Sequence, residues 1–437
     1  LASILAQKRG ERVLVLEANA VPGGCTHCHE VDGFEFNSGV DSVGDMDPSV
    51  GRGLTRPMID FVTGGKLDWA RMPDVHEVCA FGDEEFSWHS SSEANIEWVE
   101  RQFPGQGDVR AYYALEERCE WWSWSWGLTK LFPQWVPEGM RDMFYRGSGG
   151  AWRRYMQRSA DAVMRNELGF SQKLAAIYSY MYGNYGKIPA LAPFTLHALV
   201  SFHYRHGAFY PVGGPAQIPA TIIPIVEAAG GQVAVGSRVE RILVEGDRAV
   251  GVRLANGEEV RAKKIVSDAS AWVTFTQLLD PETSTRHGYA QRFESLAPSP
   301  AHLSLELGFD EPIDLPKHIT WHMPHGPGVP QYDLAAADQL YKGEQAMGAM
   351  PAYVICPSAR DPVYRQRFGD KSTVEVLAEA APGWIERARE DKTFRDEFTA
   401  RAKERLLEIA HQRVPALRGK TPTVERFRTP TGCNPMA

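Results

Sequence analysis

Residues 12–24 read RVLVLEANAVPGG, and this stretch decides the fold. Its first five residues predict a short strand, because alternating valine and leucine without turn residues are typical of strands. Glu17 ends the strand, and Gly23 and Gly24 follow in a loop whose backbone can approach a phosphate closely. In a dinucleotide-binding βαβ unit, an acidic residue at this point accepts hydrogen bonds from a ribose. The stretch therefore predicts a nucleotide site of the Rossmann type.

The residues before this strand predict the second half of a helix, which ends at Gly10. The first strand and the Gly-x-Gly-x-x-Gly turn of such a unit do not occur upstream in the sequence. We therefore expect an α/β fold with a Rossmann-like domain that lacks its first strand and phosphate loop. We also expect this sequence alone to bind its nucleotide weakly, because several amide hydrogen bonds to the pyrophosphate are lost.

The composition excludes several classes of protein. The chain has 437 residues, 43% of them hydrophobic, which is enough for two or three domains. A net charge of −8 argues against a nucleic-acid partner. No apolar run reaches the roughly 18 residues that a membrane-spanning helix needs. Six cysteines in a chain of this length do not form a disulfide scaffold.

The pattern of elements changes twice along the chain. Helices with little strand character are expected between about residues 46 and 205, and an α/β pattern returns near Phe209. We predict a helix over 218–229 with a kink at Pro224. Further predictions are strands over 233–235, 238–244, 249–254 and 259–262, a type I′ hairpin at Asn256-Gly257, and a buried strand over 265–269.

These segments predict a discontinuous organisation. Residues 1–60 and 206–275 form the nucleotide-binding domain. Residues 61–205 form a largely helical substrate-binding or membrane-facing insert. Residues 276–437 form the rest of the substrate domain and the start of an incomplete C-terminal region.

A Cys-x-x-Cys-His sequence lies at residues 25–29, inside the nucleotide loop. Its spacing is typical of covalent haem attachment, and with His27 it could also form part of a zinc site. A redox-active thiol pair is a third interpretation. No second cysteine pair completes a zinc site, so we expect no metal and interpret these residues as ordinary loop residues.

The most aromatic stretch contains four tryptophans between Trp121 and Trp126, followed by Trp135 and by several arginines. Indole rings and arginines suit a membrane interface, so peripheral membrane contact is one interpretation. The other is an aromatic core or a substrate tunnel. His203 and Tyr210 lie in a segment rich in histidine and tyrosine, and either is a candidate proton donor or a packing residue.

The order of these motifs resembles the flavin-dependent family of phytoene desaturases, carotenoid isomerases and retinol saturases, and is most similar to the last. The likeness is densest at residues 10–45 and 195–270, and it includes Phe209-Tyr210-Pro211-Val212-Gly213-Gly214 and Pro357-Ser358-Ala359-Arg360-Asp361-Pro362. The ending from Thr429 to Ala437 departs from the family pattern, so truncation at both ends is expected.

The resemblance implies a bound FAD, with NAD or NADP as a candidate electron donor. Glu17 would hold the ribose, Gly23 and Gly24 the pyrophosphate side, and Val239 the adenine through its backbone. The resemblance also implies Gly39 at the cofactor site, and it places Gly213 and Gly214 beside the flavin ring.

The implied reaction is an oxidation or reduction of C=C bonds in a lipophilic polyene, a retinoid or carotenoid. The nearest likeness is saturation of the 13,14 double bond of all-trans-retinol. The alternatives are a carotenoid cis–trans isomerase or phytoene-type desaturase, and a catalytically inert lipid-binding fragment. The resemblance also implies association with a membrane of the endoplasmic reticulum or of a plastid.

Overall fold

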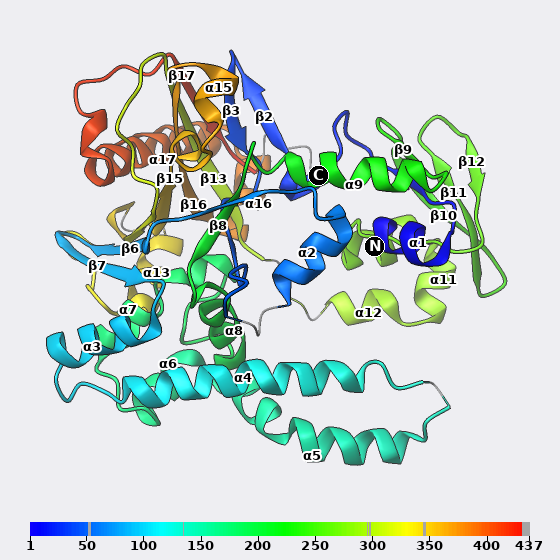
Figure 1. The fold of residues 1–437 in the computed structure, drawn as a ribbon, viewed down its shortest axis with the longest axis horizontal. Helices are drawn as coiled ribbons and strands as arrows, with labels where there is room; N and C mark the ends of the chain where they lie inside the picture. The colour runs from blue at the N-terminus through cyan, green and yellow to red at the C-terminus, as the bar shows by residue number, and fades with distance from the viewer. Residues whose placement is uncertain (51–53, 134, 295, 297–298, 344–346, 431–437) are drawn as a thin grey trace.

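The computed structural model describes residues 1–50, 54–133, 135–294, 296, 299–343 and 347–430. A sheet-rich body, a smaller α/β part and a projecting helical hairpin make up the molecule (Figure 1). Both the fold class and the mixture of helix and sheet agree with the expectation from the sequence.

The α/β part is built around the stretch that opens the sequence. Helix α1 (Ala2–Arg9) ends at Gly10, which takes a left-handed conformation and donates its N–H to Leu5. Strand β1 (Leu14–Leu16) pairs in parallel with β9 (Gln232–Ala234). Helix α9 (Gln217–Ala228) runs through Pro224 and packs on α1 and on α2 (Thr55–Thr63). Two segments that lie far apart in the chain thus form one α/β unit.

An antiparallel sheet extends this part. It consists of β10 (Val239–Glu245), β11 (Arg248–Leu254) and β12 (Glu259–Arg261). The predicted type I′ turn at Asn256-Gly257 is wrong, because such a turn needs positive φ at both residues and only Gly257 has it. Gly257 donates its N–H to Leu254, so the loop has three residues and ends in a left-handed glycine.

The predicted buried strand over 265–269 is also wrong. Ile265 is half-buried and the next four residues are exposed, with Val266 62% exposed. No strand of the described chain pairs with this segment, and a β-conformation without a ladder leaves its backbone groups to water. The segment leads through Ser270 into the short helical turns α10 (Ala271–Val273) and η3 (Thr274–Leu278).

The body on the left of Figure 1 contains a seven-stranded sheet with the order β17-β13-β16-β15-β14-β6-β7. The strands are β6 (Val75–Phe81), β7 (Glu84–His89), β13 (Ala301–Phe309), β14 (Ile319–Met323), β15 (Ala352–Ile355), β16 (Ser372–Ala380) and β17 (Val424–Arg428). The hairpin β6–β7 falls within the insert that the sequence indicated as helical. It joins the sheet through a parallel pair with β14, a partner that lies far along the chain.

Each face of this sheet has its own cover. One face is apolar along β13, β15 and β16 and packs against α13 (Leu334–Lys342), α16 (Pro382–Glu390) and α17 (Lys392–Arg413). The opposite face packs against the helical insert along β6, β7 and β14. The insert contains α3 (Ser92–Gln102), α4 (Val109–Thr129), α5 (Glu138–Met156), α6 (Ala160–Asn166), α7 (Gln172–Tyr178), η2 (Tyr180–Asn184) and α8 (Phe194–Tyr204).

Smaller strands connect the two parts. Strand β2 (Cys28–Val31) forms a hairpin with β3 (Phe34–Asn37), and β8 (Ala208–Pro211) pairs with β4 (Val43–Gly44) and β5 (Trp69–Arg71). The remaining helices and turns are η1 (Gly24–Thr26), α11 (Pro281–Arg286), α12 (Tyr289–Glu294), η4 (Met347–Ala349), α14 (Pro357–Arg360), α15 (Tyr364–Phe368) and η5 (Pro415–Leu417).

Helices α4 and α5 project from the molecule as an antiparallel hairpin (Figure 1). Trp122 stacks on Tyr155 and Trp126 on Trp152, at ring distances of 5.8 and 6.0 Å, which hold the helices together. None of the described helices is long and apolar enough to cross a bilayer.

Candidate cofactor and substrate site

Two pairs of glycines predicted from the sequence meet at the start of α9. Gly213 and Gly214 precede the helix with φ near +85°, a conformation that favours glycine. A Cβ on Gly23 would lie 3.0 Å from Pro219 in the first turn of α9, so this loop packs directly on the helix. Gly24 has no atom within 4 Å of the place where a Cβ would stand, which leaves its backbone open.

Gly39 lies beside the same loop. A Cβ at Gly39 would stand 3.0 Å from Cys25, and Val40 donates its N–H to the Cys25 carbonyl at 2.9 Å. The chain after β3 therefore runs close along the glycine loop.

Glu17 and Val239 lie at the end of the site near β1 and β9. The Glu17 carboxylate accepts hydrogen bonds from the backbone and side chain of Asn19, at 2.7 and 2.9 Å. Its carbonyl accepts from Ser237, just ahead of β10, where Val239 is the first residue. The structure thus brings Glu17 and the start of β10 together, and their roles at a cofactor stay predictions.

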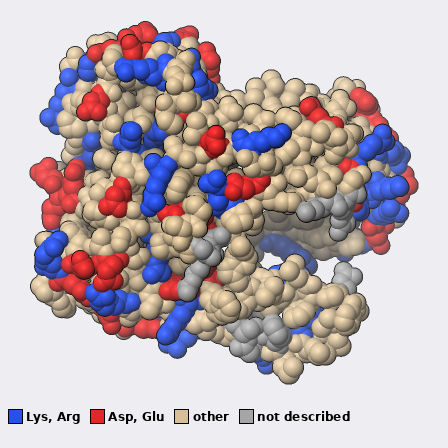
Figure 2. Space-filling view, viewed as in Figure 1, with Lys and Arg blue, Asp and Glu red and all other residues tan. Residues whose placement is uncertain are grey.

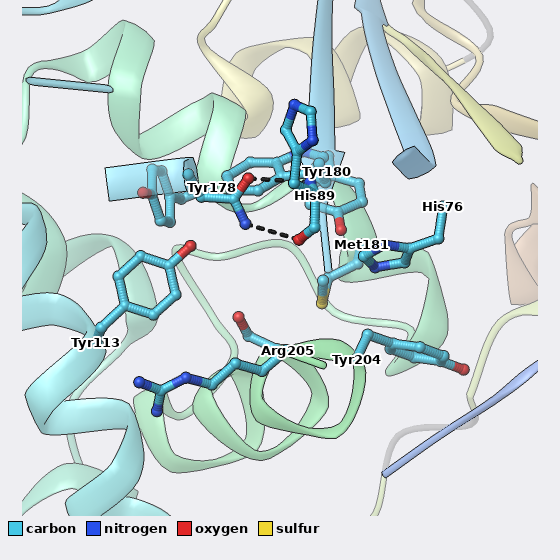
Figure 3. A pocket seen from close by; sticks show the side chains of 11 residues that line it. His76, His89, Tyr113, Tyr178, Tyr180, Met181, Tyr204 and Arg205 are labelled. Carbon is cyan, nitrogen blue, oxygen red and sulfur yellow. Dashed lines mark hydrogen bonds between the residues drawn. The ribbon is translucent and has the colours of Figure 1, made fainter. Parts of the chain in front are cut away.

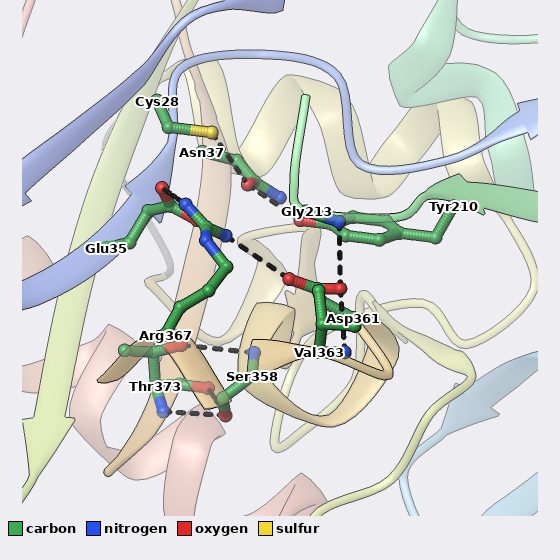
Figure 4. Close-up of polar contacts among 10 residues, drawn as sticks. All are labelled: Cys28, Glu35, Asn37, Tyr210, Gly213, Ser358, Asp361, Val363, Arg367 and Thr373. Carbon is green, nitrogen blue, oxygen red and sulfur yellow. Dashed lines mark hydrogen bonds and ion pairs between the residues drawn. The ribbon is translucent and has the colours of Figure 1, made fainter. Parts of the chain in front are cut away.

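A polar cluster fixes the glycines before α9 (Figure 4). Gly213 donates its N–H to Asp361 Oδ1 at 3.0 Å. Arg367 joins Asp361 Oδ2 at 3.2 Å to Glu35 Oε2 at 2.6 Å. A Cβ on Gly214 would lie 2.9 Å from Glu35 Oε1. This network attaches β3 and α15 to the turn before α9.

The sequence indicated Asp361 only as part of a family motif and gave no signal for its partners. Glu35 and Arg367 are 332 positions apart, so their ion pair depends on the tertiary structure.

Tyr210, a candidate proton donor, is fully buried. Its hydroxyl donates to Asn37 Oδ1 at 3.0 Å, and burial raises its pKa well above the ordinary value. The backbone N–H of Asn37 donates to Glu375 Oε1 at 2.7 Å, and burial raises the pKa of Glu375 to about 8. Glu375 was not predicted, although Thr373, Glu375 and Glu379 alternate with apolar residues in the sequence and so share one face of β16.

His203, the second candidate, contacts the backbone beside the cofactor segment. Its Nε2 accepts the N–H of Gly44 at 2.9 Å, and burial lowers its pKa. A neutral ring with Nε2 as acceptor carries its proton on Nδ1. His203 therefore has a structural partner in β4, and its catalytic role stays a prediction.

His197 is buried between Tyr112 and Tyr185, at 2.9 and 3.2 Å. Burial lowers its pKa to about 4, so it is neutral at physiological pH. It was grouped with His203 in the sequence, but it lies in the aromatic core of the insert.

The Cys-x-x-Cys-His motif is divided between a loop and a strand. Cys25 is exposed in η1, whereas Cys28 is buried in β2, where burial raises its pKa to about 12. His29 is hydrogen-bonded to Glu306 at 3.0 Å. In the described part of the chain, no group of three or more metal-binding side chains is arranged to hold an ion.

The side chains around these glycines fit a flavin nucleotide. Two buried donors, Asn37 Nδ2 and Arg360 Nη2, have no hydrogen-bond partner within the described residues. Another Arg360 nitrogen donates to the carbonyl of Asp41, close after Gly39, at 2.9 Å. A flavin ring offers oxygen and nitrogen acceptors of the kind that these donors need.

Known proteins of two flavin- and nucleotide-binding families are similar to this chain. Residues 1–50 match the family "NAD(P)-binding Rossmann-like domain", and residues 148–350 match "Flavin containing amine oxidoreductase". The all-trans-retinol 13,14-reductase of Danio rerio is 30% identical over 89% of this chain, and that of Homo sapiens is 28% identical over 97%. The resemblance to flavin-dependent polyene oxidoreductases is confirmed. The chain spans 65% of the length of the Danio rerio relative and 71% of the human one.

More distant relatives share the same framework. The prolycopene isomerase of Daucus carota is 25% identical over 72% of this chain and 51% of its own length. The crystal structure of an oxidoreductase from Methanosarcina mazei superimposes with a TM-score of 0.58 at 15% identity, covering 98% of this chain and 84% of that one. This structural likeness supports the fold, which the chain shares with that oxidoreductase.

Proposed function

We propose that this protein is an FAD-dependent oxidoreductase that reduces a C=C bond of a lipophilic polyene, most like the 13,14 bond of all-trans-retinol. The observation that carries the proposal is the meeting of the two glycine pairs at the start of α9, in a chain homologous to retinol reductases. FAD, when bound and reduced, supplies the hydride for such a reaction.

The residues of the chain have three tasks in this proposal. The backbone at Gly23 and Gly24 binds the pyrophosphate, and Asp361 holds Gly213 in place beside the ring. Buried aromatic side chains of the insert exclude water and hold the apolar substrate by shape. NAD or NADP is the proposed source of electrons, in keeping with the Rossmann-like match.

A carotenoid isomerase or desaturase is the second candidate, supported by the isomerase relative. The same fold can serve these reactions, and the products distinguish them. Full-length protein is incubated with all-trans-retinol or with poly-cis carotenoids, and the products are separated by chromatography. A dihydroretinol product supports the proposal, whereas an all-trans carotenoid alone supports the isomerase.

A third candidate is a lipid-binding protein without turnover. A flavin absorbance band that purifies with the full-length protein argues against it, because an inert lipid carrier needs no flavin. Protein that binds retinol but carries no flavin contradicts the proposed function.

Membrane contact through α4 and α5 is part of the proposal. The far part of the hairpin exposes a group of large apolar side chains, which are Trp121, Trp124, Leu128, Leu131, Trp135, Met140 and Met143. Trp121 is 71% exposed and Trp135 is 80% exposed. Figure 2 shows few charges on this part of the visible face, although Arg146 and Arg154 are exposed on α5.

Exposed indole rings together with arginines are suited to a lipid headgroup region. A lipid-dissolved polyene would enter from such a surface. The proposed compartment, a membrane of the endoplasmic reticulum or of a plastid, follows from the family resemblance, which includes a chloroplastic isomerase.

A further inference from the structure

One face of the large sheet is apolar, whereas the opposite face carries a row of acidic and aromatic side chains. Side chains that are paired across neighbouring strands point to the same face. Glu77 on β6 pairs with Ile319 on β14, and Trp321, two residues further, pairs with Tyr353 on β15. Glu77, Trp321 and Tyr353 therefore share a face that continues to Glu375 on β16 through its pair with Ile355.

Two small cavities lie beside Tyr180, which lines both of them and hydrogen-bonds to Glu77. The first has a volume of about 30 Å³ and is also lined by His76, Trp88 and Tyr204 (Figure 3). The second has a volume of about 20 Å³, and its lining includes Trp321 and Tyr353. Trp88 stacks on Tyr180 at 5.2 Å, and Tyr180 meets Trp321 edge-on at 5.8 Å.

Glu77 lies beneath this aromatic row and is 0% exposed. The Tyr180 hydroxyl donates to Glu77 Oε2, and Oε1 has no hydrogen-bond partner among the described residues. Nor does Glu77 form an ion pair within that part of the chain.

Burial raises the pKa of Glu77 to about 8. The hydrogen bond from Tyr180, the Arg360 guanidinium and the nearby Trp321 indole lower this pKa, and Asp41 raises it. The net result is a carboxyl group that carries its proton at neutral pH, because an unpaired buried carboxylate is costly.

We propose that Glu77 is the proton donor for reduction of the polyene, with Tyr180 as its positioning residue. This inference rests on the proposed function. A hydride adds to one carbon of the C=C bond, while the O–H bond of Glu77 breaks and a new C–H bond forms at the other carbon. Glu77 is left as a carboxylate, and the two electrons come from the reduced flavin that the proposed function requires.

The surroundings of Glu77 support this role. Asp41, close after Gly39, is near enough to influence its pKa, which places Glu77 beside the predicted flavin-binding segment. His89 lines the first cavity and its side chain is 33% exposed. Tyr180, which donates to Glu77, lines the same cavity.

The test uses full-length, FAD-containing protein and the Glu77→Gln variant, which keeps the shape of the side chain but has no acidic proton. Flavin is reduced without oxygen, mixed with all-trans-retinol, and its reoxidation and the loss of retinol absorbance are followed in one turnover. We expect this step to slow by about 100-fold or more, the usual effect of losing a general acid. Retinol binding, measured by tryptophan fluorescence quenching, and FAD content are expected to stay unchanged.

Infrared difference spectroscopy gives a readout that needs no turnover. The wild type should show the carbonyl band of protonated Glu77, and Glu77→Gln should lack this one band while it keeps that of Glu375, whose pKa is also about 8. Tyr180→Phe should shift this band, because Glu77 loses its hydrogen-bond donor, and should slow reduction less than Glu77→Gln does. Thermal unfolding of each variant checks that the protein is folded.

Glu116→Gln is the matched control. Glu116 is also 0% exposed and lies on α4 outside the aromatic row, but its carboxylate has an ion partner, Arg205, at 3.8 Å. We expect this variant to reduce retinol at the wild-type rate.

Two outcomes separate the inference from the function on which it rests. Wild-type protein that holds reduced FAD and binds retinol but reduces no polyene contradicts the proposed function, and the role of Glu77 falls with it. Wild-type turnover with an equal rate in Glu77→Gln, or infrared spectra in which the two proteins show the same carboxyl bands, overturns the assignment of Glu77 alone.

Discussion

The backbone N–H of Gly213 donates a hydrogen bond of 3.0 Å to the carboxylate of Asp361, although 148 positions separate them in the chain. Asp361 also accepts from Arg367, so one buried carboxylate connects α14 and α15 to the turn before α9. The position of the glycines at the predicted flavin ring therefore depends on a segment of the large-sheet body.

Asp361→Ala should weaken both folding and FAD retention. The substitution removes the acceptor of the Gly213 and Val363 N–H groups and one of the two hydrogen bonds of Arg367 Nη1, which keeps Glu35. Hydrogen bonds to a charged group are worth about 1.5–3 kcal/mol. The free energy of unfolding and the flavin-to-protein absorbance ratio measure the two effects. Asp370→Ala, which removes an exposed ion pair with Arg365, is the control and should change stability by less than about 1 kcal/mol. Equal losses in both variants would contradict this role.

Gly214→Ala should lower both the stability of the protein and its FAD content, whereas the strain of the backbone conformation alone lowers only the stability. Its Cβ would lie 2.9 Å from Glu35 Oε1, and φ is +85°. Gly257 also has φ of +85° but has no atom within 4 Å of its Cβ position, so Gly257→Ala is a matched control. Both variants should lose about 1–2 kcal/mol from the backbone conformation. Only Gly214→Ala should also release FAD, and retention of FAD in that variant would show that this turn does not hold the cofactor.

Stability should fall as pH rises from about 5 to about 8, in part because of Glu375. Burial raises the pKa of this carboxyl to about 8, with Glu306 and Asp41 acting in the same direction and the Asn37 N–H and Arg360 against it. The folded state then binds more protons than the unfolded state in this interval, so deprotonation favours unfolding. Glu375→Gln keeps an acceptor for Asn37 without this titration.

The comparison is made by unfolding wild type and Glu375→Gln at several pH values. The difference in unfolding free energy should grow by at least about 1 kcal/mol in favour of the variant between pH 5 and pH 8, which corresponds to less than one pKa unit. A constant difference would mean that Glu375 is already ionised at the lower pH.

Membrane contact should depend on the exposed side chains of the α4–α5 hairpin. A variant with alanine at Trp121, Trp124, Leu131 and Trp135 should bind liposomes at least about tenfold more weakly, because each removed side chain contributes apolar area. Flotation with anionic liposomes measures this. Trp272→Ala is the control, since Trp272 is 52% exposed on α10 and lies outside the hairpin. Unchanged flotation of the fourfold variant would contradict the membrane interpretation.

The structure also divides the aromatic stretch in a way that its sequence does not reveal. Trp122 and Trp126 pack on α5, whereas Trp121 and Trp124 face solvent. One helix therefore carries both packed tryptophans, as the core interpretation expects, and exposed tryptophans, as the membrane interpretation expects. The distinction depends on the position of α5, and a run of tryptophans does not encode that position by its spacing alone.

Local pattern determined the parts of the fold that depend on near neighbours. Helix α1 with its glycine end, strand β1 with Glu17, helix α9 and the three strands β10–β12 agree with the expected elements. The turn at Asn256-Gly257 was placed correctly but given the wrong type, because two- and three-residue loops share these residues. The predicted strand over 265–269 was wrong, because apolar residues form a strand only when a neighbouring strand supplies hydrogen-bond partners.

The sequence by itself determined the nucleotide-binding framework and the class of cofactor, because a strand, an acidic end and paired glycines are encoded within a few consecutive residues. Only the tertiary structure decided the large sheet and the site on it. The parallel pair between β6 and β14, the ion pair of Glu35 with Arg367 and the burial of Glu77 all join distant segments. A side chain's partners, its burial and hence its protonation arise from packing across the whole chain, and no local pattern of residues specifies them.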